Sequence, residues 1–306
     1  MTTTLERPPA TDAASSASVS ARRARTARRA RPPRPAVVVA LVFVAFLVAL
    51  VALPGVFAAY DPYATDIGSS LRAPSAEHWF GTDRLGRDIW SRIVFGARFS
   101  VLIGLAAAAI SVVVGTVVGI AAGLSGAFLI GRSGRVLDEG LTRSMDVISA
   151  FPAILLAMLV VTFTGPGVWN IALAIGIAGI PLYARVVRAQ TFVVTRADYV
   201  AHAAVYGRSR WAVLREHVLP NALVAVPVLA AIDIGTSILA VSGLSFLGLG
   251  PQAPVPEWGV MLAESRDVLR VAWWAGVFPG LFITGSVIAF TTIGRWLQTR
   301  DDGSRS

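Results

Sequence analysis

The chain has 306 residues, of which 55% are hydrophobic, with a net charge of +9 and a mean hydropathy of +0.67. This composition is too apolar for a soluble globular domain and is typical of a protein with several membrane-spanning helices. The sequence contains neither cysteine nor lysine, which excludes disulfides, cysteine-ligated metal sites and a nucleotide-binding P-loop, because that loop needs its lysine.

The first 35 residues form a strongly basic segment ahead of the first apolar stretch. Residues 1–35 hold eight arginines and two acidic residues in a context rich in Ser, Ala and Pro. Such a segment has no apolar periodicity, so it is predicted to be a disordered tail. An arginine-rich run can bind nucleic acid. Directly before an apolar span, however, it favours a cytoplasmic topology signal that contacts anionic membrane lipid, and we expect no nucleic-acid partner.

Six apolar segments follow the tail. The first has 24 uncharged residues and would form a helix of about 36 Å, long enough to cross a bilayer. The predicted spans are 36–59, 99–124, 147–164, 168–184, 222–247 and 271–294. The sequence therefore predicts an all-α polytopic membrane protein with six transmembrane helices.

These spans divide the chain into four parts. After the tail at 1–35, residues 36–98 are predicted to form the first transmembrane helix and an extracytoplasmic loop. Residues 99–297 form a five-helix core that contains a polar loop at 185–221, and residues 298–306 form a second tail.

The distribution of arginine predicts the orientation. Six spans place both termini on one side, and the segments on that side hold 20 of the 27 arginines. By the positive-inside rule, both termini and the 185–221 loop lie in the cytoplasm, and the protein resides in the cytoplasmic (inner) membrane.

Two features inside the spans are informative. Gly115, Gly119 and Gly123 recur every four residues on one face of the second span, which predicts close approach of another helix. Asp233 lies 12 residues, roughly 18 Å, into the fifth predicted span. Because a carboxylate at that depth costs about 2.5–3.5 kcal/mol, it should face the bundle interior or a water-filled path. A structural role and a place in the translocation path both remain open for Asp233.

The extracytoplasmic loop offers three residues that could suggest a metal or hydrolytic site, His78, Asp83 and Asp88. No cysteine, no second nearby histidine and no nucleophile–base pair accompanies them. We therefore expect no catalytic, cofactor-binding or metal-binding residues in this chain.

The polar segment between the fourth and fifth spans, 198–223, is predicted to form two short helices separated by a turn at Gly207, with Ser209 capping the second. In that helix Trp211, Leu214 and Val218 are spaced to share one apolar face, and Pro220 should end it. The pattern alone also fits an amphipathic helix lying on an anionic membrane surface.

A family resemblance distinguishes these interpretations. The small residues at 202–204, Gly207 and the pair Leu219-Pro220 resemble the loop that ABC-importer permeases insert into a groove of their ATPase subunit. The resemblance implies the type I importer permease fold and gives the loop the role of coupling helix. Its expected coupling residues are Ala201, His202, Ala203, Gly207, Trp211, Leu214, Leu219 and Pro220. The glutamate that usually opens the motif is replaced by Ala201, so a salt bridge made through it is not expected here.

Three further segments extend the resemblance over residues 36–297. They are HWFGTDRLGRDIWSRIVFGARFS (78–100), DVISAFPAILLA (146–157) and SFLGLGPQAPVPEWGVML (245–262). They are similar to signatures of the C-type permeases of the peptide and nickel importer group. This resemblance implies a subunit without enzymatic activity that translocates di- or oligopeptides by alternating access. It also implies a second homologous permease, two ABC ATPase subunits and an extracytoplasmic substrate-binding protein as partners.

Two alternatives stay open. Nickel chelates or glutathione could replace peptides, because the signatures are shared across these substrates. In a different class, the chain could be a self-sufficient secondary transporter, which would require inverted repeats and an ion site in broken helices.

Overall fold

The computed structural model describes residues 34–128 and 132–303, and most of the predicted tail at 1–35 lies outside them. Apart from one bridge between Thr82 and Asp88, the regular structure of these residues is helical. The longer helices are α2 (Arg34–Ala52), α4 (Ile89–Phe128), α5 (Arg132–Ser149), α6 (Ala153–Thr164), α7 (Val168–Thr195), α11 (Val226–Phe246) and α13 (Trp274–Gly303). The predicted boundary at residue 297 thus falls inside α13, which continues to Gly303.

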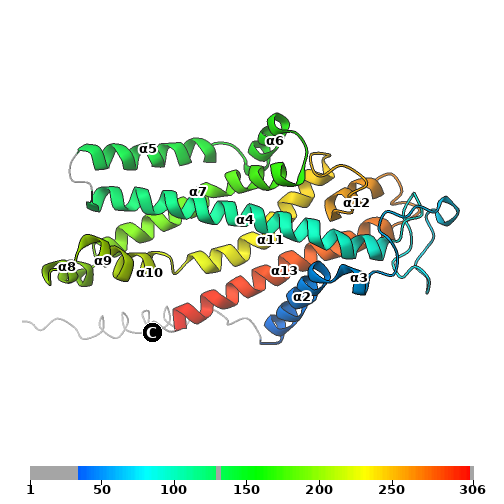
Figure 1. Cartoon of the computed structure of the whole chain (residues 1–306), viewed down its shortest axis with the longest axis horizontal. Helices are drawn as coiled ribbons and strands as arrows, with labels where there is room; N and C mark the ends of the chain where they lie inside the picture. Colours follow the sequence, from blue (N-terminus) through cyan, green and yellow to red (C-terminus); the bar gives the residue numbers. More distant parts are fainter. Residues whose placement is uncertain (1–33, 129–131, 304–306) are drawn as a thin grey trace, which may run out of the picture.

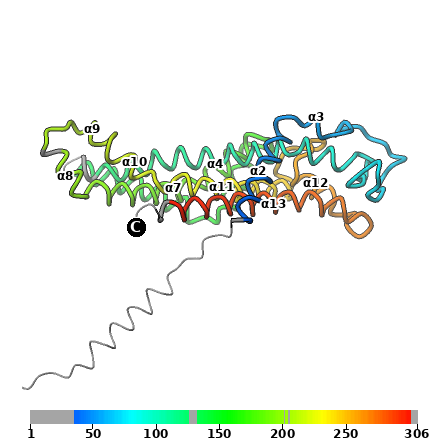
Figure 2. Tube along the Cα trace, turned by 90° about the horizontal axis from the view of Figure 1, so that it is seen from below, coloured from blue at the N-terminus to red at the C-terminus, as the bar shows by residue number. Residues whose placement is uncertain are grey.

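The long helices run along one axis and form an elongated bundle (Figure 1). The short helices α8 (Asp198–Val205), α9 (Arg210–Val213) and α10 (Leu219–Ala222) lie at one end. The short helices α3 (Pro54–Phe57) and α12 (Trp258–Ser265) lie at the other. Figure 2 shows the same separation from a perpendicular direction. The polar segment 198–223 and the loop 58–88 are therefore at opposite ends of the molecule.

Five helices are individually long and apolar enough to cross a membrane: α2, α4, α7, α11 and α13. The remaining predicted span, the third at 147–164, corresponds to the end of α5 and to α6, and these two helices meet this criterion only when they are taken together. The two helices are bent by 90° at their junction. The described part of the chain therefore contains five spans, or six if this bent pair counts as one.

The third predicted span, 147–164, is not a single straight helix. The helix is interrupted between Ser149 and Ala153. Pro152 disfavours helical geometry at the residue before it, and it has no backbone N–H to donate to the carbonyl group of the preceding helical turn. Residues 132–146, which lie between the second and third predicted spans, form most of the amphipathic helix α5. The charged residues of this helix make it too polar to be predicted as an apolar span.

The glycine spacing in α4 has the predicted consequence. A Cβ atom built on Gly119 would lie 2.7 Å from the Ala184 carbonyl oxygen, and one on Gly123 would lie 2.6 Å from Thr191 Cβ. Gly115 is equally close to Tyr183. The three glycines thus form one seam in which the backbones of α4 and α7 touch, as in other small-residue helix interfaces.

Candidate functional site

The segment 198–223, which we call the elbow, begins as predicted. Helix α8 ends before Gly207, whose φ of +77° lies in the left-handed region that glycine adopts at low cost. The Ser209 hydroxyl then accepts a hydrogen bond from the Ala212 N–H at 3.2 Å and caps α9. The predicted turn and N-cap are confirmed.

The end of the second helix differs from the prediction. Pro220 does not end it, because the chain stays helical to Ala222. The turn Leu214–Val218 is a π-helix, in which the Leu219 N–H donates to the Leu214 carbonyl. A π turn adds a residue to the helical repeat, and this local adjustment allows a proline to follow without ending the helix.

Buried valines attach the elbow to the bundle. Val213 and Val218 are buried in a small cluster with Val194 at the end of α7 and Val200 of α8. Leu124 of α4 packs against the same cluster. The elbow is therefore a folded unit that rests on the ends of α4 and α7.

The outer surface of the elbow carries two large exposed aromatic residues. Tyr206 is 87% exposed and Trp211 is 70% exposed. The predicted apolar face is divided, because Val218 points into the bundle with no exposure while Trp211 points away from it. The π turn accounts for this difference, since it shifts the register between the two residues.

The remaining predicted coupling residues also lie on the elbow. Ala201, His202 and Ala203 are in α8, where the side chain of His202 is exposed and that of Ala203 is partly buried. Leu214 and Leu219 are partly buried, and Pro220 is exposed. An exposed ion pair of 2.5 Å joins Arg208, directly after the turn at Gly207, to Glu216 in the π turn.

Asp233 faces a cavity of about 190 Å³ between α6, α7 and α11. The Tyr183 hydroxyl donates to Asp233 Oδ2 at 3.0 Å, and the Thr236 hydroxyl donates to Oδ1 at 3.2 Å. The rest of the cavity is lined mostly by small or apolar side chains, among them Ala157, Ala178 and Ala240. The sequence predicted that this carboxylate would face the bundle interior or a path. In the structure it is hydrogen-bonded to neighbouring side chains and also lines the cavity.

The depth of Asp233 needs a correction. Helix α11 begins at Val226 rather than near residue 222, so Asp233 follows its first residue by seven positions and precedes its last by thirteen. This corresponds to roughly 10 Å from the elbow end of α11 instead of 18 Å. The side chain therefore lies in the half of the span nearer the elbow.

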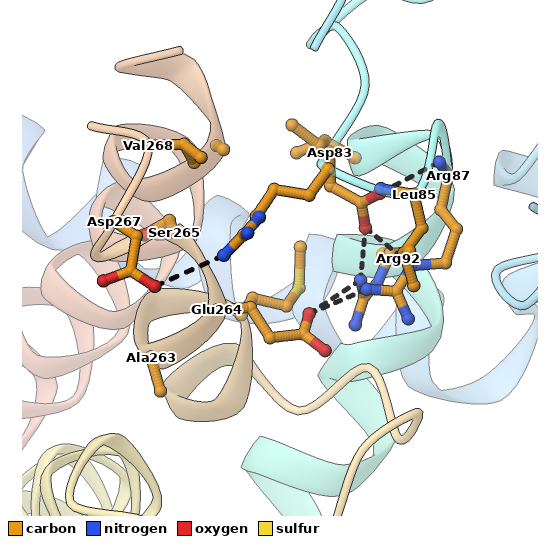
Figure 3. Close-up of a pocket in the computed structure, with 13 residues that line it drawn as sticks. Asp83, Leu85, Arg87, Arg92, Ala263, Glu264, Ser265, Asp267 and Val268 are labelled. Carbon is orange, nitrogen blue, oxygen red and sulfur yellow. Dashed lines mark hydrogen bonds and ion pairs between the residues drawn. The ribbon is translucent and has the colours of Figure 1, made fainter. Parts of the chain in front are cut away.

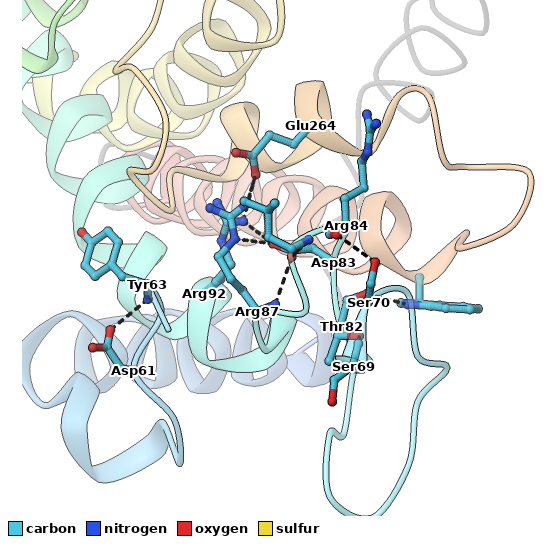
Figure 4. A network of polar contacts seen from close by, with 12 residues as sticks. Asp61, Tyr63, Ser69, Ser70, Thr82, Asp83, Arg84, Arg87, Arg92 and Glu264 are labelled. Atoms are coloured by element: carbon cyan, nitrogen blue, oxygen red, sulfur yellow. Dashed lines mark hydrogen bonds and ion pairs between the residues drawn. The ribbon is translucent and has the colours of Figure 1, made fainter. Parts of the chain in front are cut away.

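The opposite end of the molecule contains a larger polar cavity of about 390 Å³ (Figure 3). The Arg87 guanidinium contacts Asp83 at 2.7 Å and Glu264 at 2.9 Å, and Arg92 contacts both of the same carboxylates (Figure 4). Arg92 lies in the first turn of α4, Arg87 lies two residues before this helix, and Glu264 comes from α12, so the network joins the start of α4 to α12. Among the described residues, Arg92 Nε and Nη2 are buried and have no hydrogen-bond partner.

This network, which we call the outer clamp, unites two of the signature segments. Ser100 donates to Glu257 Oε1 at 3.0 Å, and the Trp258 indole N–H donates to the Ile93 carbonyl at 3.0 Å. The contact between these segments was not predicted from the sequence, although two arginines and an acidic residue within apolar sequence are a signal for it. The suspected trio is also split, because His78 pairs with Asp88 at 2.9 Å while Asp83 belongs to the clamp.

No group of three or more potential metal ligands of the His, Cys, Asp and Glu types occurs within residues 34–128 and 132–303. The expectation of a chain without a metal site stays a prediction. We take the exposed elbow and the cavity beside Asp233 as the candidate functional sites.

Comparisons with known proteins give the family. Residues 115–302 match the family model described as "Binding-protein-dependent transport system inner membrane component". The dipeptide transport system permease protein DppC of Alkalihalophilus pseudofirmus is 40% identical over 234 residues, covering 76% of this chain and 74% of that protein. The probable D,D-dipeptide transport system permease protein DdpC of Escherichia coli K12 is 40% identical over 237 residues, with 78% and 77% covered.

A relative named for a different substrate is similar to the same degree. The glutathione transport system permease protein GsiD of Pectobacterium atrosepticum is 42% identical over 225 residues, covering 74% of this chain and 72% of that protein.

A solved structure shares the fold. The MetNI methionine ABC transporter in inward-facing conformations aligns with a TM-score of 0.53 at 16% identity, covering 67% of this chain and 96% of that one. The chain has the fold of an ABC-importer membrane subunit, and it belongs to the family of inner-membrane components of binding-protein-dependent transport systems.

Proposed function

We propose that this chain is the permease subunit of an ATP-driven importer that carries di- or oligopeptides across the cytoplasmic membrane. The observation that carries the proposal is the pairing of the family with an exposed, folded elbow at one end of the bundle. Relatives named as dipeptide permeases support the peptide substrate.

In this proposal the elbow is the coupling element. Tyr206 and Trp211 expose large aromatic surfaces to the outside of the described structure, and aromatic residues of this kind often dominate the affinity of a protein interface. A Cβ atom added at Gly207 would meet no heavy atom of the described residues within 4 Å, so the space beside it is open for a partner. A groove on an ATPase subunit would cover this surface, and its movement on ATP binding would be passed to α4 and α7 through Val213 and Val218.

The partners follow from this role. The importer would contain a second homologous permease, two ABC ATPase subunits and an extracytoplasmic substrate-binding protein, and this chain would perform no chemistry of its own. Both termini and the elbow would lie in the cytoplasm, and the loop 58–88 would face outward. The cavity beside Asp233 would form part of the translocation path.

Glutathione is a second candidate substrate, because the GsiD relative is as similar as the dipeptide permeases. Uptake by the complete importer tests both candidates. Proteoliposomes that contain both permeases and the ATPases are supplied with the binding protein on the outside. They should accumulate labelled dialanine only when ATP is enclosed in their lumen, on the side of the ATPase subunits. Accumulation of glutathione but not of dialanine would identify glutathione, rather than a dipeptide, as the substrate. Accumulation of neither would refute the proposal.

A further inference from the structure

The cavity beside Asp233 has a single charged group among the described residues that line it. Its walls come from Ala153, Ile154 and Ala157 of α6, from Ile175, Ala178 and Gly179 of α7, and from Asp233, Thr236, Ser237, Ala240 and Leu244 of α11. None of these residues is basic. Among the ion pairs of the described residues, none includes Asp233, although arginines pair with Asp138 and Asp146 on the neighbouring helix α5.

The hydrogen bonds to the Asp233 side chain come from neutral hydroxyl groups. Tyr183 donates its O–H to one oxygen, and Thr236 donates to the other an O–H that it shares with the Asp233 backbone carbonyl. The Ser237 hydroxyl also interacts with this carboxylate. A carboxylate accepts about four hydrogen bonds in total, so the side chain of Asp233 keeps capacity for a donor that enters the cavity. A carboxylate within a membrane span usually has a cationic partner or faces a path, and the residues that line this cavity include no such partner.

The size of the cavity limits what this donor can be. At about 190 Å³ the cavity is smaller than the sites of about 300 Å³ or more that enclose whole drug-sized ligands. It is suited to one end of a peptide. The negative charge of Asp233 would repel the terminal carboxylate and attract the terminal ammonium, which can donate an N–H to a free acceptor position of the carboxylate.

We propose that Asp233 binds the α-ammonium group of the peptide as it passes between α6, α7 and α11. The small side chains of Ala157 and Ala178, together with Gly179, leave room for the first residue of the peptide beside the carboxylate. The site lies in the half of α11 nearer the elbow. The amino terminus of the peptide would therefore be held on the side where the proposed ATPases act. This inference rests on the proposed peptide transport and adds the chemical group that the path recognises.

The test compares two substrates in two complexes. The substrates are dialanine and isobutyryl-alanine, in which a methyl group stands in place of the ammonium. Uptake is measured in proteoliposomes of the complete importer at concentrations that saturate the binding protein. The ratio of the two rates is compared between the wild type and Asp233→Asn. The same binding protein acts in both complexes, so its own preference cancels and the change in the ratio reports the permease.

We expect Asp233→Asn to lower the preference for dialanine by about tenfold, the effect of losing one hydrogen bond to a charged group. The asparagine keeps the shape of the side chain and can still accept from Tyr183. An unchanged preference, or an equal fall in the uptake of both substrates, would overturn the ammonium site while leaving peptide transport intact. If the wild type imports no peptide, the proposed function fails, and this inference fails with it.

A second variant serves if Asp233→Asn does not assemble. Thr236→Lys places an ammonium group three residues along the same helix face, where it can pair with Asp233. The paired carboxylate should no longer favour dialanine over isobutyryl-alanine. An assembled Thr236→Lys complex that keeps the full preference would also overturn the proposal.

Discussion

Replacement of Gly119 by alanine should force α4 and α7 apart. The new Cβ would lie 2.7 Å from the Ala184 carbonyl oxygen, 2.8 Å from Val187 Cβ and 3.0 Å from the Arg188 nitrogen. Carbon atoms pack best at about 3.5–4.0 Å, so the helices must separate locally by roughly 0.8 Å or more. A tilt cannot relieve the contact, because Gly115 and Gly123 are equally tight one turn to either side.

The cost can be isolated with a matched control. Gly140 is also inside a helix, α5, and a Cβ built there meets no described atom within 4 Å. Alanine raises helix propensity at both positions by about 1 kcal/mol, so this gain cancels in the comparison. The difference between the two variants should be about 1–3 kcal/mol, the usual cost of overpacking a tight site.

The assay is the free energy of unfolding in mixed micelles, followed by the fluorescence of the chain's eight tryptophans during an SDS titration. Gly119→Ala should unfold at lower SDS than Gly140→Ala. Equal stability of the two variants would refute the reasoning that the α4–α7 seam depends on the missing side chains.

Two further predictions concern the ends of the molecule. Glu264→Ala leaves two buried arginines without that partner and should lower the free energy of unfolding by about 3–5 kcal/mol in the same titration. Asp267→Ala breaks an exposed ion pair and should cost less than about 1 kcal/mol. Similar losses in the two variants would contradict a structural role for the outer clamp. Because the chain has no cysteine, a membrane-impermeant maleimide should label Ile67→Cys on intact cells and Tyr206→Cys only after permeabilisation. Labelling of Tyr206→Cys from outside would reverse the orientation.

The sequence predicted the parts of the fold that depend on local pattern. Apolar length located α2, α4, α7, α11 and α13, and the spacing of the α4 glycines indicated a close helix contact. The turn at Gly207 and the cap at Ser209 follow from side-chain chemistry over a few residues, and both were correctly assigned.

The parts that were missed depend on contacts between distant segments or on small changes of helical repeat. The outer clamp joins Arg92 to Glu264, which lie far apart in the sequence, and no periodicity links them. The π turn at 214–218 turns Val218 inward and leaves Trp211 outside, which a regular helix pattern cannot show. The break before Ala153 was masked because the residues around Pro152 are apolar enough to resemble one span.

The most direct test of the coupling role is co-purification of the ATPase subunits with elbow variants of the permease. Trp211→Ala removes a large exposed ring, which at the centre of an interface costs about 2 kcal/mol or more. Gly207→Val adds a side chain at a backbone angle of +77°, where it is strained by about 1–2 kcal/mol, and fills the open space beside it. Trp79→Ala, a similarly exposed ring at the other end of the bundle, is the matched control.

We expect Trp211→Ala and Gly207→Val to insert normally but to lose the ATPase subunits or the stimulation of ATP hydrolysis by the peptide-loaded binding protein. Trp79→Ala should keep the ATPase subunits bound, and Arg210→Ala should have a much smaller effect than either elbow variant. Full ATPase binding and full stimulation in both Trp211→Ala and Gly207→Val would contradict the account and favour an elbow that lies on the membrane surface.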